Sequence, residues 1–147
     1  MRTLAGILLL FSLLGCGKSF KNDADSASGT VKVQIIAPGS VSEDPESTNP
    51  YTFQIVELLD VYDLVSASGQ YAQFYTRASR SDTRLNGTQP HGQYMKNKDG
   101  VFIPKNFLTQ QIATLYYHSQ NMMRLETSLD LETKRTRPLK IVLDTPV

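Results

Sequence analysis

The chain of 147 residues contains one cysteine, no tryptophan and two histidines. A lone cysteine has no partner within the chain, so no internal disulfide braces the fold. A catalytic zinc site needs three closely held protein ligands. Neither His91 nor His118 has a ligand-spaced neighbour in the sequence, which argues against a metal site. The formal net charge of +1 gives no electrostatic reason to expect nucleic-acid binding.

Sequence motifs for common catalytic and phosphate-binding sites are missing as well. The chain lacks Gly-x-Ser-x-Gly, His-Glu-x-x-His and the phosphate-binding Gly-x-x-x-x-Gly-Lys-Ser/Thr. Glu57, Asp60 and Asp63 are close in sequence, but the two-residue period of a strand spreads them over both of its faces. The sequence therefore predicts no catalytic residue, no metal and no cofactor. An enzyme is the less favoured interpretation.

The N-terminus has the three parts of a signal peptide. Arg2 supplies a positive charge, and residues 4–14 are apolar except for Gly6 and Ser12. A run of about eleven residues suits a signal peptide but is shorter than the roughly 20 residues of a membrane-spanning helix. No later stretch of the sequence is long and apolar enough to span a membrane. We therefore assign residues 1–15 to a signal peptide.

The leader ends in Leu13-Leu14-Gly15-Cys16, which resembles the lipobox of bacterial lipoproteins. The resemblance implies cleavage between Gly15 and Cys16, a diacylglyceryl group on the Cys16 thiol and a further acyl chain, such as palmitate, on the new amine. The implied partner is membrane lipid. Each buried methylene contributes about 0.8 kcal/mol, so two or three acyl chains anchor stably where one is marginal. Gly17 follows the cysteine in place of Asp, which by the enterobacterial sorting pattern implies the outer membrane.

The rest of the chain is predicted to hold a tether and one domain. Residues 16–28 begin with the lipidated cysteine and continue with small, polar residues, which indicates a flexible tether. Residues 29–147 are enough for one compact domain but not for two.

Predicted strands share β-branched residues and alternating apolar positions, and they cover residues 31–36, 51–65, 70–77, 101–103 and 139–143. The second strand has a phase slip near Leu58 where a β-bulge would fit. It is expected to form a hairpin with the third, over residues 51–77. Residues 40–50, with two prolines, are expected to form a loop.

One long helix is predicted over residues 106–129, capped by Asn106. Its apolar residues recur at spacings of three and four and form one stripe: Leu108, Ile112, Leu115, Tyr116, Met122, Met123 and Leu129. Leu115 is expected to be buried, whereas Gln111 and Gln120 lie off the stripe. The predicted class is α+β, a small and mostly antiparallel sheet with this helix packed on it.

Residues 78–99 are polar and glycine-rich, which indicates a long loop. Arg77, Arg80 and Arg84, with Tyr75 nearby, form a candidate binding patch for an anionic polymer. The alternative is a polar loop that keeps the domain soluble.

A second resemblance concerns the C-terminal third. Val101-Phe102-Ile103-Pro104, a helix with Tyr116-Tyr117-His118, and then residues 137–143 are similar to the start of the catalytic domain of thermolysin- and fungalysin-like zinc peptidases. The similarity covers about 45 residues and no catalytic ones. It implies a truncated, inactive relative without a zinc-binding helix.

Three functions are therefore consistent with the sequence. The favoured one is a membrane-anchored lipoprotein with a structural or binding role at the bacterial cell envelope. The alternatives are the inactive peptidase relative and a binding module for an anionic polymer.

Overall fold

The structure is a computed structural model, which describes residues 21–38, 51–81, 84–131 and 138–143. It contains eight strands and one helix in these residues: β1 (Gly29–Pro38), β2 (Tyr51–Asp63), β3 (Ser68–Gly69), β4 (Ala72–Ser81), β5 (Arg84–Thr88), β6 (Tyr94–Lys96), β7 (Phe102–Pro104), α1 (Phe107–Ser128) and β8 (Leu139–Leu143). The predicted α+β class is confirmed. The predicted signal peptide, the lipobox and the loop at 40–50 lie outside the described residues.

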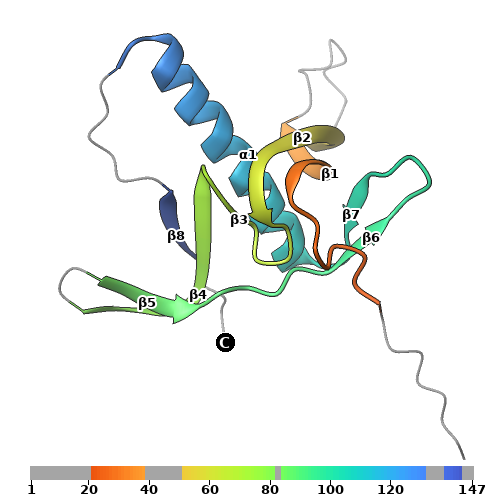
Figure 1. The fold of residues 1–147 in the computed structure, drawn as a ribbon, viewed down its shortest axis with the longest axis horizontal. Coiled ribbons are helices and arrows are strands. Elements are labelled where there is room, and N and C mark those ends of the chain that lie inside the picture. The colour runs from red at the N-terminus through yellow and green to blue at the C-terminus, as the bar shows by residue number, and fades with distance from the viewer. Residues whose placement is uncertain (1–20, 39–50, 82–83, 132–137, 144–147) are drawn as a thin grey trace, which may run out of the picture.

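The strands form two sheets rather than the single sheet that we predicted. One sheet has the order β3-β2-β1-β7-β6, and the other has the order β5-β4-β8. Four of the six strand pairings among the described residues are antiparallel, and β1–β7 and β4–β8 are parallel. Figure 1 shows α1 between the two sheets, with β1 and β2 on one side and β4 and β8 on the other. Residues of both sheets and of α1 form one apolar core.

The predicted bulge in β2 is present. Val31 pairs with Leu58 and Gly29 with Val61, so β2 has one residue more than β1 over this span. Asp60 takes a left-handed backbone conformation with φ of 50°. Leu58 and Val61 are three positions apart, and both are buried. In a regular strand they would lie on opposite faces, so the extra residue allows both side chains to face the core.

The predicted hairpin over residues 51–77 is wrong. On the edge that faces away from β1, β2 pairs only with the two residues of β3 among the described residues. The chain then leaves this sheet, and β4 lies parallel to β8 and antiparallel to β5. The physical reason is that α1 packs against both sheets, so β4 joins a second sheet that covers the other side of the helix. In the second sheet, β4 buries Ala72 and Phe74 in the shared core.

The loop predicted over residues 78–99 is also wrong, because β4 extends to Ser81 and β5 and β6 follow. The backbone ladder defines these strands, and β5 has a single apolar residue, so no alternation marks it in the sequence. A tight turn precedes β7. Gly100 donates its N–H to the carbonyl of Asn97 at 3.1 Å and has φ of +80°.

Polar residues before β1 pack into the fold. The Asn22 side chain accepts a hydrogen bond from the Tyr94 N–H at 3.0 Å and donates one to the Gly92 carbonyl at 2.8 Å. Ala24 is fully buried. The prediction of a flexible tether is thus wrong for residues 22–27. The sequence did not indicate this packing, because Asn22 is held by hydrogen bonds to backbone groups and not by apolar contacts.

The helix has the predicted bounds but buries a different face. Asn106 caps it by accepting a hydrogen bond from the Thr109 N–H at 2.8 Å. Its buried residues are Thr109, Ile112, Ala113, Tyr116, Ser119, Gln120 and Met123. Leu115, Met122 and Leu129 are exposed, and Gln120 is 2% exposed, so the predicted stripe is wrong at these four positions. Several partners of the helix are backbone polar groups of β2, which an apolar pattern does not reveal.

Candidate functional site: a groove beside the helix

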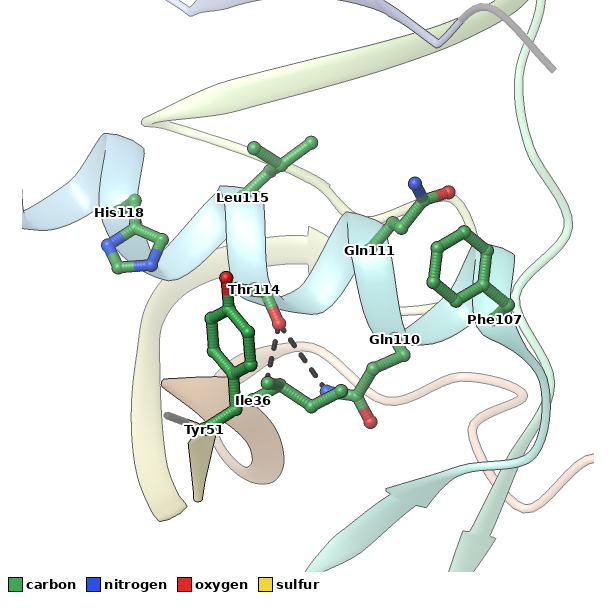
Figure 2. A pocket seen from close by; sticks show the side chains of 8 residues that line it. All are labelled: Ile36, Tyr51, Phe107, Gln110, Gln111, Thr114, Leu115 and His118. Atoms are coloured by element: carbon green, nitrogen blue, oxygen red, sulfur yellow. Dashed lines mark hydrogen bonds between the residues drawn. The ribbon is translucent and has the colours of Figure 1, made fainter. Parts of the chain in front are cut away.

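A groove of about 350 Å³ lies between the first half of α1 and the β1–β2 hairpin. Its lining residues come from three elements: Ile36, Tyr51, Phe107, Gln110, Gln111, Thr114, Leu115 and His118. Figure 2 shows Gln111 and Leu115 along one side of the helix and Gln110 and Thr114 along the other, with Phe107 and His118 toward the two ends. The volume is near the lower end of the ~300–1,000 Å³ range of small-molecule sites.

The helix closes the edge of β1 beside this groove. β1 pairs with β2 along one edge, but on its other edge β7 pairs with it only at Val33 in the described residues, so the backbone groups that follow on this second edge have no strand partner. The Ile36 N–H donates to the Thr114 hydroxyl, and the Gln110 amide donates to the Gln34 carbonyl, both at 3.4 Å. These long hydrogen bonds satisfy an edge that would otherwise invite another strand.

Two aromatic side chains at the rim are largely exposed. Phe107, the first residue of α1, is 73% exposed, and Tyr51, the first residue of β2, is 60% exposed. Neither ring belongs to the core. In Figure 2, the Tyr51 ring projects toward Thr114, whereas the Phe107 ring lies beside Gln111. Exposed aromatic rings beside polar groups are typical of binding surfaces, because they supply a large contact area.

Among the described residues, no Asp, Glu, Lys or Arg lines the groove. Within the part of the chain that the structure describes, Gln111 and His118 have no hydrogen-bond partner. An amide and a neutral imidazole each offer both donors and acceptors. The arrangement can bind an uncharged polar ligand, but its lining includes no pair of a nucleophile and a carboxylate base.

A second hollow, of about 370 Å³, is lined by Lys21, Asn22, Asp23, Asp25, Lys96 and Asn97. Its main polar groups already have structural partners. The Asp23 carboxylate accepts the Lys96 N–H at 2.9 Å, and Asn22 holds the backbone at Gly92 and Tyr94. Asn22 and Asp23 thus have structural roles in this hollow.

Two acidic residues of β2, Asp60 and Asp63, have structural roles. Asp63 closes the turn after β2 by accepting hydrogen bonds from the N–H groups of Val65 and Ser66, each at 3.1 Å. The Asp60 carboxylate accepts a hydrogen bond from the Tyr71 hydroxyl at 3.2 Å. Over the described ranges, no group of three or more His, Cys, Asp or Glu residues could hold a metal ion.

The two histidines lie in different segments of the chain, one before β6 and one on α1. His91 is exposed in the segment before β6, as the sequence predicted for a loop residue. His118 is exposed on α1, with its ring 5.9 Å from that of Tyr117, and it lines the groove.

The three arginines of the predicted polymer patch lie in the β4–β5 hairpin. Arg77 is exposed and takes a left-handed backbone conformation with φ of 51° where the register shifts. Arg80 is paired with Leu85, and Arg84 with Ser81. Polymer binding by these residues stays a prediction.

Two buried tyrosines have perturbed titration. Burial, with a smaller effect of the Asp63 charge, raises the pKa of Tyr94 well above that of a free tyrosine. Burial also raises the pKa of Tyr116, and a backbone hydrogen bond at Tyr71 opposes the rise in part. Tyr116 binds backbone groups of β2, whereas the Tyr94 hydroxyl is buried without a hydrogen-bond partner among the described residues.

The structure is an α+β fold with a groove of mixed apolar and polar lining beside α1. Comparison of the chain with protein-family models, curated proteins and solved structures finds no match. None of the described helices is long and apolar enough to cross a membrane. The sequence analysis missed the groove, because its residues are brought together from β1, β2 and α1. The one available signal was a pair of glutamines and a histidine on one helix, at positions 110, 111 and 118.

Proposed function

We propose that this protein is a lipid-anchored binding protein of the bacterial cell envelope, held by acylated Cys16, in the outer membrane. One observation carries the proposal: the only cysteine follows directly on an apolar leader and a small residue, Gly15. Attachment of acyl chains there would tie the folded domain to a membrane surface.

The binding role rests on the groove. The groove places two exposed aromatic rings beside polar side chains that have no hydrogen-bond partner among the described residues. Phe107 and Tyr51 supply apolar contact area, and Gln111 and His118 supply donors and acceptors that are free among the described residues. Binding fits this set better than catalysis, because the described lining residues include no pair of a nucleophile and a carboxylate base.

Replacement of the lipidated residue tests the anchor. The full chain is produced in a bacterial host with radiolabelled palmitate, as the natural sequence and as Cys16→Ser. We expect label and membrane retention in the natural protein and neither in the variant. Cys16→Ala is a second variant that excludes an effect of the new hydroxyl. If the natural protein takes up no label, or if Cys16→Ser stays in the membrane fraction, the anchor proposal fails.

A further inference from the structure

We propose that the groove binds an uncharged N-acetylated sugar, in the form of a short oligosaccharide. This inference rests on the proposed binding function and adds the class of ligand. The argument uses the charge of the groove, the shape of its lining and the state of the neighbouring strand edge.

The lining selects against charge. Among the residues that the structure describes, no Asp, Glu, Lys or Arg lines the groove, so a charged ligand would lose water against this lining without gaining an opposite charge. Phosphates, carboxylates and amines are therefore poor ligands, and a polar but neutral molecule is favoured.

The mixture of groups in the groove matches an acetamido sugar. A pyranose ring has one apolar face of C–H groups, and the exposed rings of Phe107 and Tyr51 offer a complementary surface. An acetamido group carries one N–H donor, one carbonyl acceptor and a methyl group. The Gln111 amide can pair with the first two, and Leu115 lies one turn away for the methyl group.

The length of the groove indicates more than one sugar ring. Phe107 and His118 are eleven residues apart on α1, which corresponds to about 16 Å along the helix axis. The imidazole at the far end can bond a hydroxyl of a second or third ring.

An extended peptide is a less suitable occupant. Such a peptide would add to the free edge of β1 through backbone hydrogen bonds. The Gln34 carbonyl and the Ile36 N–H on that edge are already bonded to Gln110 and Thr114. The edge beside the groove is thus closed to strand addition.

Calorimetric titration of the full-length lipidated protein in detergent tests the inference with two matched probes. One is the neutral trimer of β-1,4-linked N-acetylglucosamine. The other is the same trimer without its acetyl groups, which is cationic. We expect binding of the acetylated trimer and at least about tenfold weaker binding of the deacetylated one, since the second loses the acetamido contacts and gains uncompensated charge.

Variants locate the binding. Phe107→Ala and Gln111→Ala should each lower the affinity for the acetylated trimer about tenfold. Leu125 is exposed on the same helix but lies outside the groove, so Leu125→Ala should leave this affinity unchanged. Phe107 is largely exposed, so its replacement should not disturb folding, and a thermal melt checks this.

Three results would overturn the inference: no binding of the acetylated trimer, equal binding of both trimers, or unchanged affinity in Phe107→Ala. Self-association that Phe107→Ala abolishes would also overturn it, in favour of a second copy in the groove. These results leave the binding function standing if photocrosslinking in cells, described at the end of the Discussion, still detects an occupant at Phe107. If the crosslink at Phe107 is also absent, the proposed binding function fails as well.

Discussion

The hydroxyl of Tyr116 on α1 donates a hydrogen bond to the carbonyl of Leu59, at 2.9 Å, inside the bulge of β2. The Asp60 carbonyl is also within reach, at 3.2 Å. One turn further along, the Gln120 amide accepts from the Leu59 N–H at 2.8 Å and donates to the Glu57 carbonyl at 3.1 Å. A bulge leaves backbone groups without ladder partners, and these two side chains satisfy them.

Removal of the Tyr116 hydroxyl should therefore destabilise the fold. Tyr116→Phe leaves a buried carbonyl without its donor, which costs about 1–3 kcal/mol in the free energy of unfolding. Tyr94→Phe is the matched control, because that hydroxyl is equally buried but has no partner in the described residues. We expect its effect to be near zero or stabilising. Urea unfolding of both variants gives the comparison, and similar losses in the two would contradict the assigned roles.

Gln120 should matter more for stability than Gln111, although both are helix glutamines. Gln120→Ala removes two hydrogen bonds to the bulge, so we expect a loss of about 1–3 kcal/mol. Gln111→Ala removes a side chain without a described partner and should change stability by less than about 0.5 kcal/mol. Equal melting midpoints for the two variants would show that Gln120 does not hold the bulge.

A close approach at Gly69 offers a coupled test of the same contact. A Cβ atom at Gly69 would overlap the Tyr116 hydroxyl and would come within 2.6 Å of the Asp60 carbonyl. Gly69→Ala should thus be strongly destabilising. In the Tyr116→Phe background part of the overlap is gone, so the same change should cost less. A double-mutant cycle measures this coupling. Strictly additive effects would mean that the hydroxyl does not lie over Gly69.

Packing along the helix should follow the observed buried face. Ile112 is fully buried, and Ile112→Ala should cost about 2–5 kcal/mol. Leu115 is 36% exposed, so Leu115→Ala should cost less than about 1 kcal/mol. Denaturant unfolding distinguishes the two positions. A larger loss for Leu115→Ala would restore the stripe that the sequence predicted and contradict the packing described above.

Much of the fold was readable from local patterns. Alternation predicted β1, the phase slip near Leu58 predicted the bulge, and Asn106 predicted the start of α1. Local patterns failed where long-range contacts decide. Gln120 is buried because the bulge of β2 lies against it, and no property of the helix sequence indicates such a partner.

The same limit applies to the second sheet and the groove. β4 leaves β2 because the helix needs a cover on its other side, which is a property of the assembled core. The groove has Tyr51 and Phe107, which are distant in sequence, in one lining. Neither feature has a period or a motif that a reading of the sequence could detect.

Stability should fall at high pH. Folding raises the pKa of Tyr94 and of Tyr116. Below about pH 10, the ordinary pKa of tyrosine, both hydroxyls are therefore protonated in the folded and in the unfolded chain. Above it, the unfolded chain loses these protons first, and the free energy of unfolding decreases as the pH rises. Urea unfolding between pH 8 and pH 11 should show a flat region followed by this fall. The fall should be shallower in Tyr116→Phe, and an equally steep fall would contradict the assignment.

Photocrosslinking in living cells tests the central claim, that the groove is an occupied binding site at the envelope. A photoreactive phenylalanine analogue replaces either Phe107, at the rim of the groove, or Leu125, exposed on the same helix but outside it. After irradiation of bacteria that produce the full chain, the fraction of protein with a crosslinked envelope component is measured. We predict a clearly larger fraction at position 107 than at position 125, and a loss of that signal in the Cys16→Ser background. Equal fractions at the two positions would contradict the claim.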